Sequence, residues 1–334
     1  MKQGIKDVDY LAISARIRAM ETHLLTNERL EKLLASDSQS EADKILAECG
    51  YPPLDPKYPE EMDAAIARER ARTLEDIFQG APDTRYVDTF TLKHDYHNVK
   101  TLLKAAEKGL DPEPLLVRGG RFTPEELKEA IDKNDYSALT HTIAQAIPET
   151  REALQRTKDP QLADAMLDRF AYLDMLDEAE STGSEFLIGY VKLQIDAVNL
   201  RTVVRTLRMG KPPEFIKTVL MEGGTVSPEE LINVASNKGS GLAELYSPTL
   251  LAVAAGEGVN ALSGGPLTDF ERLCDDGVMS YLSSAQMIAF GEEVLLAYLS
   301  ARETEYMNLR IILLGKAAGL DTDIIRSRIR ESYV

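Results

Sequence analysis

The segment DYHNVKTLL at residues 95–103 recurs as DAVNLRTVV at 196–204 and as EYMNLRIIL at 305–313. Each copy has an acid three residues before an Asn, an aliphatic residue directly after the Asn, and a base two residues after it. Aliphatic residues follow at plus four and plus five, and a Gly follows at plus eleven. The chain contains only eight Asn, so three in one frame indicate a repeated unit, with a period too long for a short-repeat solenoid.

This segment, which we call the repeated phrase, has the pattern of a helix with polar groups on several sides. Its aliphatic residues form an i, i+3, i+4 stripe that faces a core, and the base lies roughly 200° around the helix from the Asn. Buried polar groups need hydrogen-bond partners, so we interpret the acid, the Asn and the base as ties between helices rather than as ligand-binding groups. The predicted ties are Asp95, Asn98, Lys100, Asp196, Asn199, Arg201, Glu305, Asn308 and Arg310. The predicted C-terminal glycine caps are Gly109, Gly210 and Gly319.

Two connectors after the phrases also match one another, GGRFTPEEL at 119–127 and GGTVSPEEL at 223–231. A Gly turn, a hydroxyl residue, a Pro at the first helical position and a Glu that closes the capping box predict a helix start. The predicted N-caps are Thr123 and Ser227. A looser copy, GGPLTDFE at 264–271, precedes its phrase instead of following it, so either the repeats have diverged or this match is a coincidence.

Apolar periodicity predicts an all-α chain with about fifteen or more helices and little strand. Helices are expected within 6–35, from a cap at Ser38 to Gly50, and over the long ranges 58–80, 84–108, 160–181, 183–209 and 286–318. Thr26 is expected to cap a helix, and Ser38 with Glu41 fits a capping box. The repeats suggest three segments within one body, at about 1–118, 119–222 and 223–334.

The composition excludes several classes of function. The 334 residues carry 38 basic and 55 acidic side chains, for a net charge of −17, which argues against phosphate-backbone binding as the main activity. No run approaches the roughly 18 apolar residues of a bilayer span, and no signal peptide is visible. Cys49 and Cys274 are expected to be unpaired thiols in a reducing cytoplasm.

The sequence predicts no catalytic residue, cofactor or metal site. Residues 314–317 lack the upstream Gly and the hydroxyl of a phosphate-binding loop. Residues 256–261 superficially resemble a dinucleotide fingerprint but lack a surrounding βαβ unit, so a helix end and a loop are expected there. His94 and His97 could share a metal but are expected to be packed or solvated. Asp164 and Asp168, with Asp275-Asp276, could imitate the aspartate clusters of an isoprenoid-type enzyme, but a solvated acidic face is expected.

Three blocks resemble one known family. They are residues 15–51 (ARIRAME, then LLT at 24–26, LL at 33–34 and CGY at 49–51), DYHNVKTLLK at 95–104, and ETEY with NLR within 303–310, followed by a helix through Arg330. In order and spacing these blocks resemble the C subunit of the V/A-type (vacuolar/archaeal-type) rotary ATPases, whose eukaryotic counterpart is the V-ATPase d subunit. The resemblance spans nearly the whole chain, although residues 212–285 match only in general helical character.

This resemblance implies three similar helical bundles with pseudo-threefold symmetry that form a funnel. It implies a non-catalytic subunit, present once per complex, that joins the proteolipid rotor ring to the central stalk and couples ATP to proton or sodium transport. The subunit would bind no nucleic acid and have no membrane span, and it would lie in the cytoplasm, peripheral on the inner face of the membrane. The alternative is an unrelated all-helical adaptor that binds soluble partners.

Overall fold

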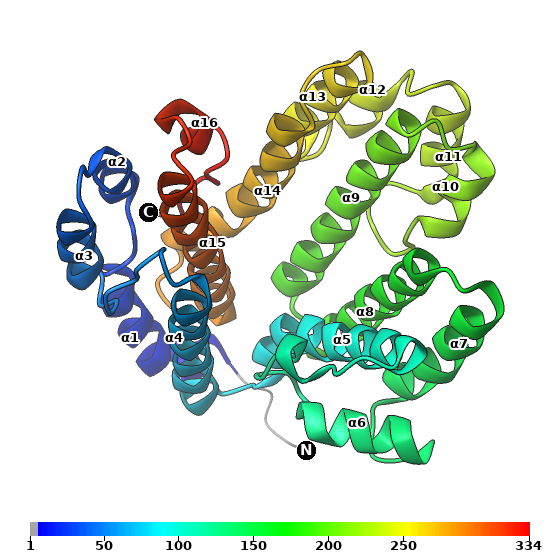
Figure 1. The fold of residues 1–334 in the computed structure, drawn as a ribbon, viewed down its shortest axis with the longest axis horizontal. Coiled ribbons are helices and arrows are strands. Elements are labelled where there is room, and N and C mark those ends of the chain that lie inside the picture. Colours follow the sequence, from blue (N-terminus) through cyan, green and yellow to red (C-terminus); the bar gives the residue numbers. More distant parts are fainter. Residues whose placement is uncertain (1–5) are drawn as a thin grey trace. The chain divides into compact units, whose positions relative to one another are not determined.

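The computed structural model describes residues 6–334, and all regular structure in that range is helical (Figure 1). It consists of sixteen α-helices and three short 3-10 helices, with no strand between residues 6 and 334. The predicted all-α class is therefore confirmed. No helix in the described part of the chain is long and apolar enough to cross a membrane.

The helices fall into two compact units. The first combines the chain up to Thr84 with Gly241–Val334, and the second is Arg85–Ser240. The first contains η1 (Asp7–Tyr10), α1 (Leu11–Glu21), α2 (Asn27–Ala35), α3 (Gln39–Glu48), α4 (Pro59–Gly80), α12 (Leu242–Tyr246), α13 (Ala252–Leu262), α14 (Leu267–Ser283), η3 (Ser284–Met287), α15 (Glu292–Ala317) and α16 (Thr322–Arg326). The second contains α5 (Arg85–Lys108), η2 (Glu113–Leu115), α6 (Pro124–Lys133), α7 (His141–Thr157), α8 (Pro160–Thr182), α9 (Glu185–Arg208), α10 (Pro213–Val219) and α11 (Pro228–Ser236). The division into 1–118, 119–222 and 223–334 concerns repeats rather than compact units, and it stays a prediction.

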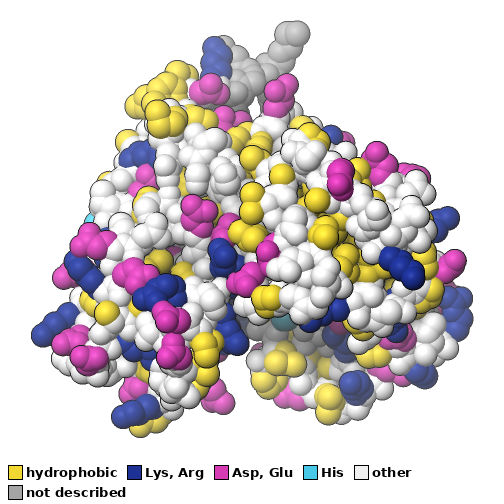
Figure 2. All heavy atoms as spheres, turned by 90° about the horizontal axis from the view of Figure 1, so that it is seen from above, with side chains coloured by type: hydrophobic (Ala, Val, Ile, Leu, Met, Phe, Trp, Pro, Cys, Tyr) yellow, Lys and Arg dark blue, Asp and Glu magenta, His cyan; other side chains and the backbone are white. Residues whose placement is uncertain are grey.

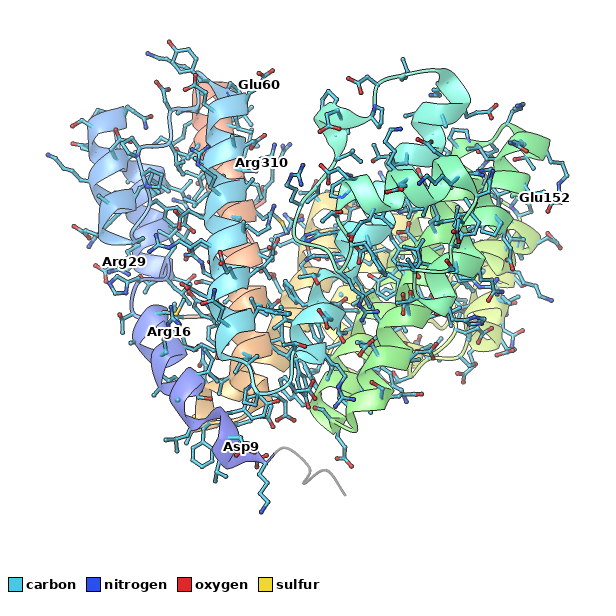
Figure 3. All side chains as sticks on the ribbon, turned by 90° about the horizontal axis from the view of Figure 1, so that it is seen from below. Asp9, Arg16, Arg29, Glu60, Glu152 and Arg310 are labelled. Atoms are coloured by element: carbon cyan, nitrogen blue, oxygen red, sulfur yellow. The ribbon has the colours of Figure 1, made fainter. Side chains whose placement is uncertain are left out.

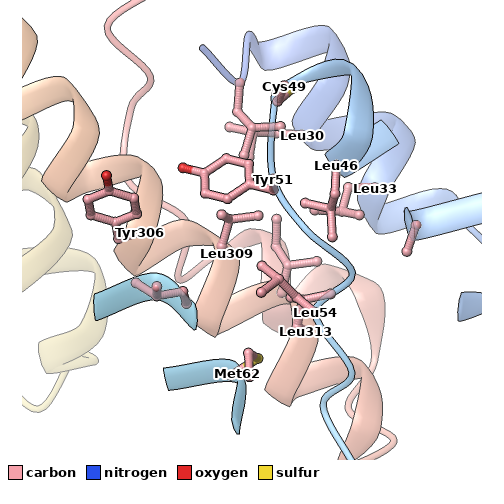
Figure 4. Close-up of a cluster of buried hydrophobic side chains, with 14 of the residues drawn as sticks. Leu30, Leu33, Leu46, Cys49, Tyr51, Leu54, Met62, Tyr306, Leu309 and Leu313 are labelled. Carbon is pink, nitrogen blue, oxygen red and sulfur yellow. The ribbon is translucent and has the colours of Figure 1, made fainter. Parts of the chain in front are cut away.

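The core of the first unit forms around α15, the helix that carries the third phrase. Figure 4 shows the phrase residues Leu309 and Leu313 in one buried cluster with Leu33 of α2, Leu46 of α3 and Met62 of α4. The stripe of α2 has the i, i+3, i+4 spacing of Leu30, Leu33 and Leu34, all buried. The third phrase therefore anchors the N-terminal helices to the C-terminal part of the chain.

The core of the second unit forms around α5, α8 and α9. Figure 1 shows α5 and α8 side by side, each paired with further helices of the same unit. Leu200, Val203 and Val204 of the second phrase are fully buried, and Val99, Leu102 and Leu103 of the first phrase are nearly so. The aliphatic stripe of each phrase thus faces the core. Burying these side chains removes apolar surface from water, which stabilises the fold.

Most predicted helices lie within two residues of their observed bounds, but two predictions at the C-terminal end were wrong. The helix expected over 286–318 begins only at Glu292, after Gly291. The helix expected to continue through Arg330 ends at Arg326, and residues 329–334 have no regular secondary structure. A different set of contacts, described below, fixes Arg330 in place.

The glycines at 256 and 258 lie inside α13 rather than in a loop, so the predicted helix end and loop were wrong there. Ala252, Ala254, Ala255 and Ala261 surround them, and the strong helix propensity of Ala offsets the roughly 1 kcal/mol that each Gly costs. Thr26 caps α2 by accepting a hydrogen bond from the Arg29 N–H, as predicted. Ser38 caps α3, but the Glu41 carboxylate accepts from the Asp37 N–H, one residue before the cap.

Candidate functional site

The Asn of every phrase binds a backbone segment beyond the end of its own helix. We extend the name connector to these segments, which are residues 115–127, 221–231 and 328–331. In each case the side-chain amide donates to the backbone C=O of one residue, and the side-chain oxygen accepts from the N–H of that same residue. The partner is Val117 for Asn98 (2.7 and 2.8 Å), Met221 for Asn199 (2.8 and 2.8 Å), and Arg330 for Asn308 (3.0 and 2.9 Å). An Asn amide has the donor and acceptor pattern of a peptide group, so it pairs with the connector as a strand would.

The acid of the first two phrases binds the same connectors. The Asp95 carboxylate accepts from the Arg121 and Phe122 N–H groups at 3.0 and 3.1 Å. The Asp196 carboxylate accepts from the N–H groups of Thr225 and Val226 at 3.1 and 3.0 Å, and also from the Thr225 hydroxyl. We call each set of acid, Asn and bound connector a clasp. Both carboxylates are completely buried.

The double glycine of the connectors follows from this arrangement. A Cβ atom added to Gly120 would overlap the carboxylate oxygen of Asp95, and one added to Gly224 would overlap that of Asp196. The preceding glycines, Gly119 and Gly223, have φ of +94° and +95°, in the region that favours glycine. The first Gly therefore turns the connector, and the second lets its backbone approach the acid.

Replacing Gly224 with Ala should destabilise the protein, because the new methyl group must push the connector off Asp196 and strain or break its hydrogen bonds. We expect a loss of about 2–3 kcal/mol, as for an overpacked core site. The control is Gly256→Ala, since a Cβ there meets nothing within 4 Å and lies on a helix. The control should leave the free energy of unfolding unchanged or raise it slightly. Equal effects in urea denaturation would contradict this account.

The third clasp is assembled from different elements. Glu305 does not reach the connector; it accepts from the Leu25 N–H at 2.5 Å, from Arg302 at 2.5 Å and from the Tyr51 hydroxyl. Asp276 of α14 binds the connector instead, accepting from the Glu331 N–H at 2.9 Å. Gly265, from the looser sequence copy, lies against Asn260, whereas Gly120 and Gly224 lie against carboxylates.

The bases of the first and third phrases lie on the side of the helix that faces a neighbouring helix. Lys100 pairs with Asp168 of α8 at 2.5 Å, and Arg310 pairs with Asp63 of α4 at 2.8 Å. Figure 3 shows Arg310 beside α4. Arg201 has the equivalent position on α9 and is half-buried. These partly exposed pairs each contribute little to stability, about 0–1 kcal/mol.

The helix ends repeat as well. Gly109, Gly210 and Gly319 have φ of +63°, +69° and +68°. The N–H of the next residue returns to the carbonyl five positions earlier in all three, in the Schellman pattern. Thr123 and Ser227 accept from the N–H groups of Glu126 and Glu230, which starts the helix after each connector.

Burial raises the pKa of Asp95 from its usual 3.8 to about 6, although the two backbone N–H donors act in the opposite direction. Burial also raises the pKa of Asp196. When folding raises the pKa of a carboxyl, the protonated form of that group stabilises the folded state relative to the ionised form. This contribution is fully present below the unfolded pKa and is lost as the pH rises through the folded pKa.

We therefore expect that raising the pH from 5 to 7.5 lowers the free energy of unfolding of the wild type by about 1.5 kcal/mol more than that of Asp95→Asn. Urea denaturation of both proteins at the two pH values gives this difference directly. Asp135→Asn is the control, because Asp135 is exposed and its hydrogen bonds with Ser137 lower its pKa, so it stays ionised throughout this range. A pH-independent difference for Asp95→Asn would mean that burial does not disfavour its ionised form.

The residues that the sequence analysis considered as metal ligands make other contacts in the structure. His94 and His97 contact the first connector separately, at the carbonyls of Gly119 (3.3 Å) and Leu115 (3.0 Å). Asp164 pairs with Lys104 at 2.8 Å, so the acidic face of α8 serves ion pairs with α5. In residues 6–334 no group of three or more His, Cys, Asp or Glu could hold a metal. Both cysteines are buried.

Reasoning from the sequence missed a buried charged cluster on α15. Arg302 and Glu305 are 8% and 5% exposed, and the Arg302 guanidinium lies over the rings of Tyr51 and Tyr306 at 5.1 and 4.9 Å. Burial raises the pKa of Glu305, while the Arg302 charge opposes that rise. The sequence does show an arginine and a glutamate three residues apart, but this spacing of opposite charges is also common on exposed helices.

The fold and the clasps define a helical scaffold whose repeated polar groups are used to bind its own backbone. Residues 13–328 match the protein family described as ATP synthase (C/AC39) subunit. The C subunit of the V-type sodium ATPase of Enterococcus hirae is 26% identical over 332 residues, covering 98% of this chain and 99% of that protein. The C subunit of the V-type ATP synthase of Thermus thermophilus is 24% identical over 338 residues, covering 98% of both chains.

The chain therefore belongs to the C/AC39 subunit family of the V/A-type ATPases, which includes homologues of the eukaryotic d subunit. The resemblance inferred from the three sequence blocks is confirmed over nearly the full chain.

Proposed function

We propose that this chain is a non-catalytic central-stalk component that couples the proteolipid rotor ring to the central stalk of a V/A-type rotary ATPase. The family match over residues 13–328 carries the proposal. The coupling would link ATP hydrolysis or synthesis to transport of protons or sodium, with the ion chosen by the ring. One copy per complex would lie in the cytoplasm, peripheral on the inner face of the membrane.

The clasps support this role physically. A protein that transmits torque must resist deformation, and each clasp binds a connector that would otherwise be free to move. The Asp95 and Asp196 carboxylates accept from backbone N–H groups, so a structural role accounts for both. We also propose that the three repeats form similar bundles in a pseudo-threefold funnel, with the ring on one face and the stalk in the hollow.

The test is affinity purification of the tagged chain from gently solubilised membranes, followed by quantitative mass spectrometry. We expect the proteolipid, the stalk subunits and the ATP-hydrolysing head, with one copy of this chain per complex. An untagged strain is the control. Recovery of soluble proteins alone, with the chain absent from membranes, would contradict the proposal and favour the helical adaptor.

A further inference from the structure

The third copy of the phrase has a small cavity beside its acid. In the first two copies the acid, Asp95 or Asp196, accepts hydrogen bonds directly from connector N–H groups. In the third copy a cavity of about 10 Å³ is lined by both Glu305 and Ser332, the residue that follows the connector. A buried water molecule needs roughly 10–15 Å³, so the cavity has the size of a site for a single water.

Polar side chains line this cavity from two elements. Those that can form hydrogen bonds are Thr304, Glu305 and Asn308 of α15 and Ser332 beyond the connector, beside apolar residues that include Leu24 and Ala301. Cavities that stay empty are apolar, whereas a buried water forms about two to four hydrogen bonds with polar groups around it. The composition of the lining therefore favours a cavity that contains water.

Two of these side chains can form hydrogen bonds beyond those already described. Asn308 uses one amide N–H and one oxygen lone pair to bind Arg330, and a side-chain amide has a second of each. The Ser332 hydroxyl donates to the Leu25 C=O at 2.8 Å, which leaves its oxygen able to accept. A water in the cavity can therefore accept from Asn308 and donate to Ser332.

The Glu305 carboxylate can accept one more hydrogen bond as well. Figure 2 shows acidic and basic side chains interspersed over the face in view, whereas Glu305 is only 5% exposed. Its oxygens accept from Leu25, Arg302 and Tyr51, and an ionised carboxylate offers about four acceptor positions. Burying a charge is costly unless its hydrogen bonds are satisfied, so a further donor in the cavity would stabilise this carboxylate.

We propose that the cavity binds one ordered water molecule, which completes the third clasp. The water donates to the Glu305 carboxylate and to the Ser332 hydroxyl oxygen, and it accepts from the Asn308 amide. About three hydrogen bonds are typical of a buried water. The acid of the third copy thus reaches the chain beyond its connector through water, whereas Asp95 and Asp196 bind their connectors directly. This water site does not depend on the proposed function.

The first test is a high-resolution crystal structure of the full wild-type chain. We expect a peak of density in the cavity at hydrogen-bond distance, about 2.6–3.2 Å, from both the Glu305 carboxylate and the Ser332 hydroxyl. Other buried waters in the same map serve as the internal control. An empty cavity in a map that shows such waters would overturn the inference. A direct contact between Glu305 and Ser332 that closes the cavity would overturn it too.

A second test counts long-lived waters in solution by oxygen-17 magnetic relaxation dispersion. Ala301→Val adds two methyl groups at the cavity wall and should lower the count by about one water molecule relative to wild type. Ala67→Val, at an exposed position on α4 of the same unit, is the matched control and should leave the count unchanged. Equal counts for wild type and a folded Ala301→Val variant would contradict the proposal. If that variant does not fold, the wild-type crystal structure still decides.

Discussion

Replacing Asn199 with Leu should lower the free energy of unfolding by about 4 kcal/mol, because it leaves two buried backbone groups without partners. Asn199 is fully buried, and it satisfies both the N–H and the C=O of Met221, which is itself 5% exposed. Water cannot replace the lost hydrogen bonds at so buried a site. The melting temperature should fall by roughly 10 °C.

Two comparisons make this prediction specific. Asn98→Leu should cost less, since Val117 is only half-buried and water can reach its backbone. Asn233→Leu, at an exposed position on α11 of the same unit, should change the free energy of unfolding by less than about 0.5 kcal/mol. An unchanged melting temperature for Asn199→Leu would rule out the clasp as a stabilising element.

Replacing Arg302 with Met should lower the free energy of unfolding by about 3–5 kcal/mol, as expected when one partner of a buried ion pair is removed. The Glu305 carboxylate would keep its hydrogen bonds from Leu25 and Tyr51 but lose the cation with which it pairs. Without that cation the pKa of Glu305 rises further, because the Arg302 charge normally opposes the effect of burial. The ionised form is then penalised, so the variant should be less stable at pH 8 than at pH 6, relative to wild type.

Urea denaturation at the two pH values measures both effects. Arg326→Met is the matched control, since Arg326 pairs with Glu31 at 3.0 Å while both side chains are about half exposed. It should cost less than about 1 kcal/mol. If both variants have equal, pH-independent costs, the buried pair does not anchor the N-terminal helices to α15.

The sequence alone predicted the helices and their ends well, because those depend on local chemistry. Periodic apolar residues located α4, α5, α8 and α9, and glycine caps marked the ends of the phrase helices. The interior of α7 shows the limit of local rules: Pro148 lies within that helix, although Pro usually ends one. Packing of buried neighbours such as Ile143 and Ile147 holds the helix together despite this loss.

The partners of the polar phrase residues could not be predicted, because they depend on how the chain returns after the helix. The Asn was expected to reach another helix, whereas it binds a connector 19 to 22 residues downstream. The role of the double glycine could not be predicted either, because only the structure shows that Gly120 and Gly224 lie against carboxylates. In the third copy, Asp276 comes from a helix outside the phrase, and no sequence spacing indicates that replacement.

The most direct test of the proposed coupling is ATP-driven ion transport by the complex reconstituted into vesicles with and without this chain. We predict that the complex lacking the chain still hydrolyses ATP but transports no ions, and that adding back the purified wild-type chain restores transport. Full ion transport by a complex shown by mass spectrometry to lack the chain would contradict the proposal.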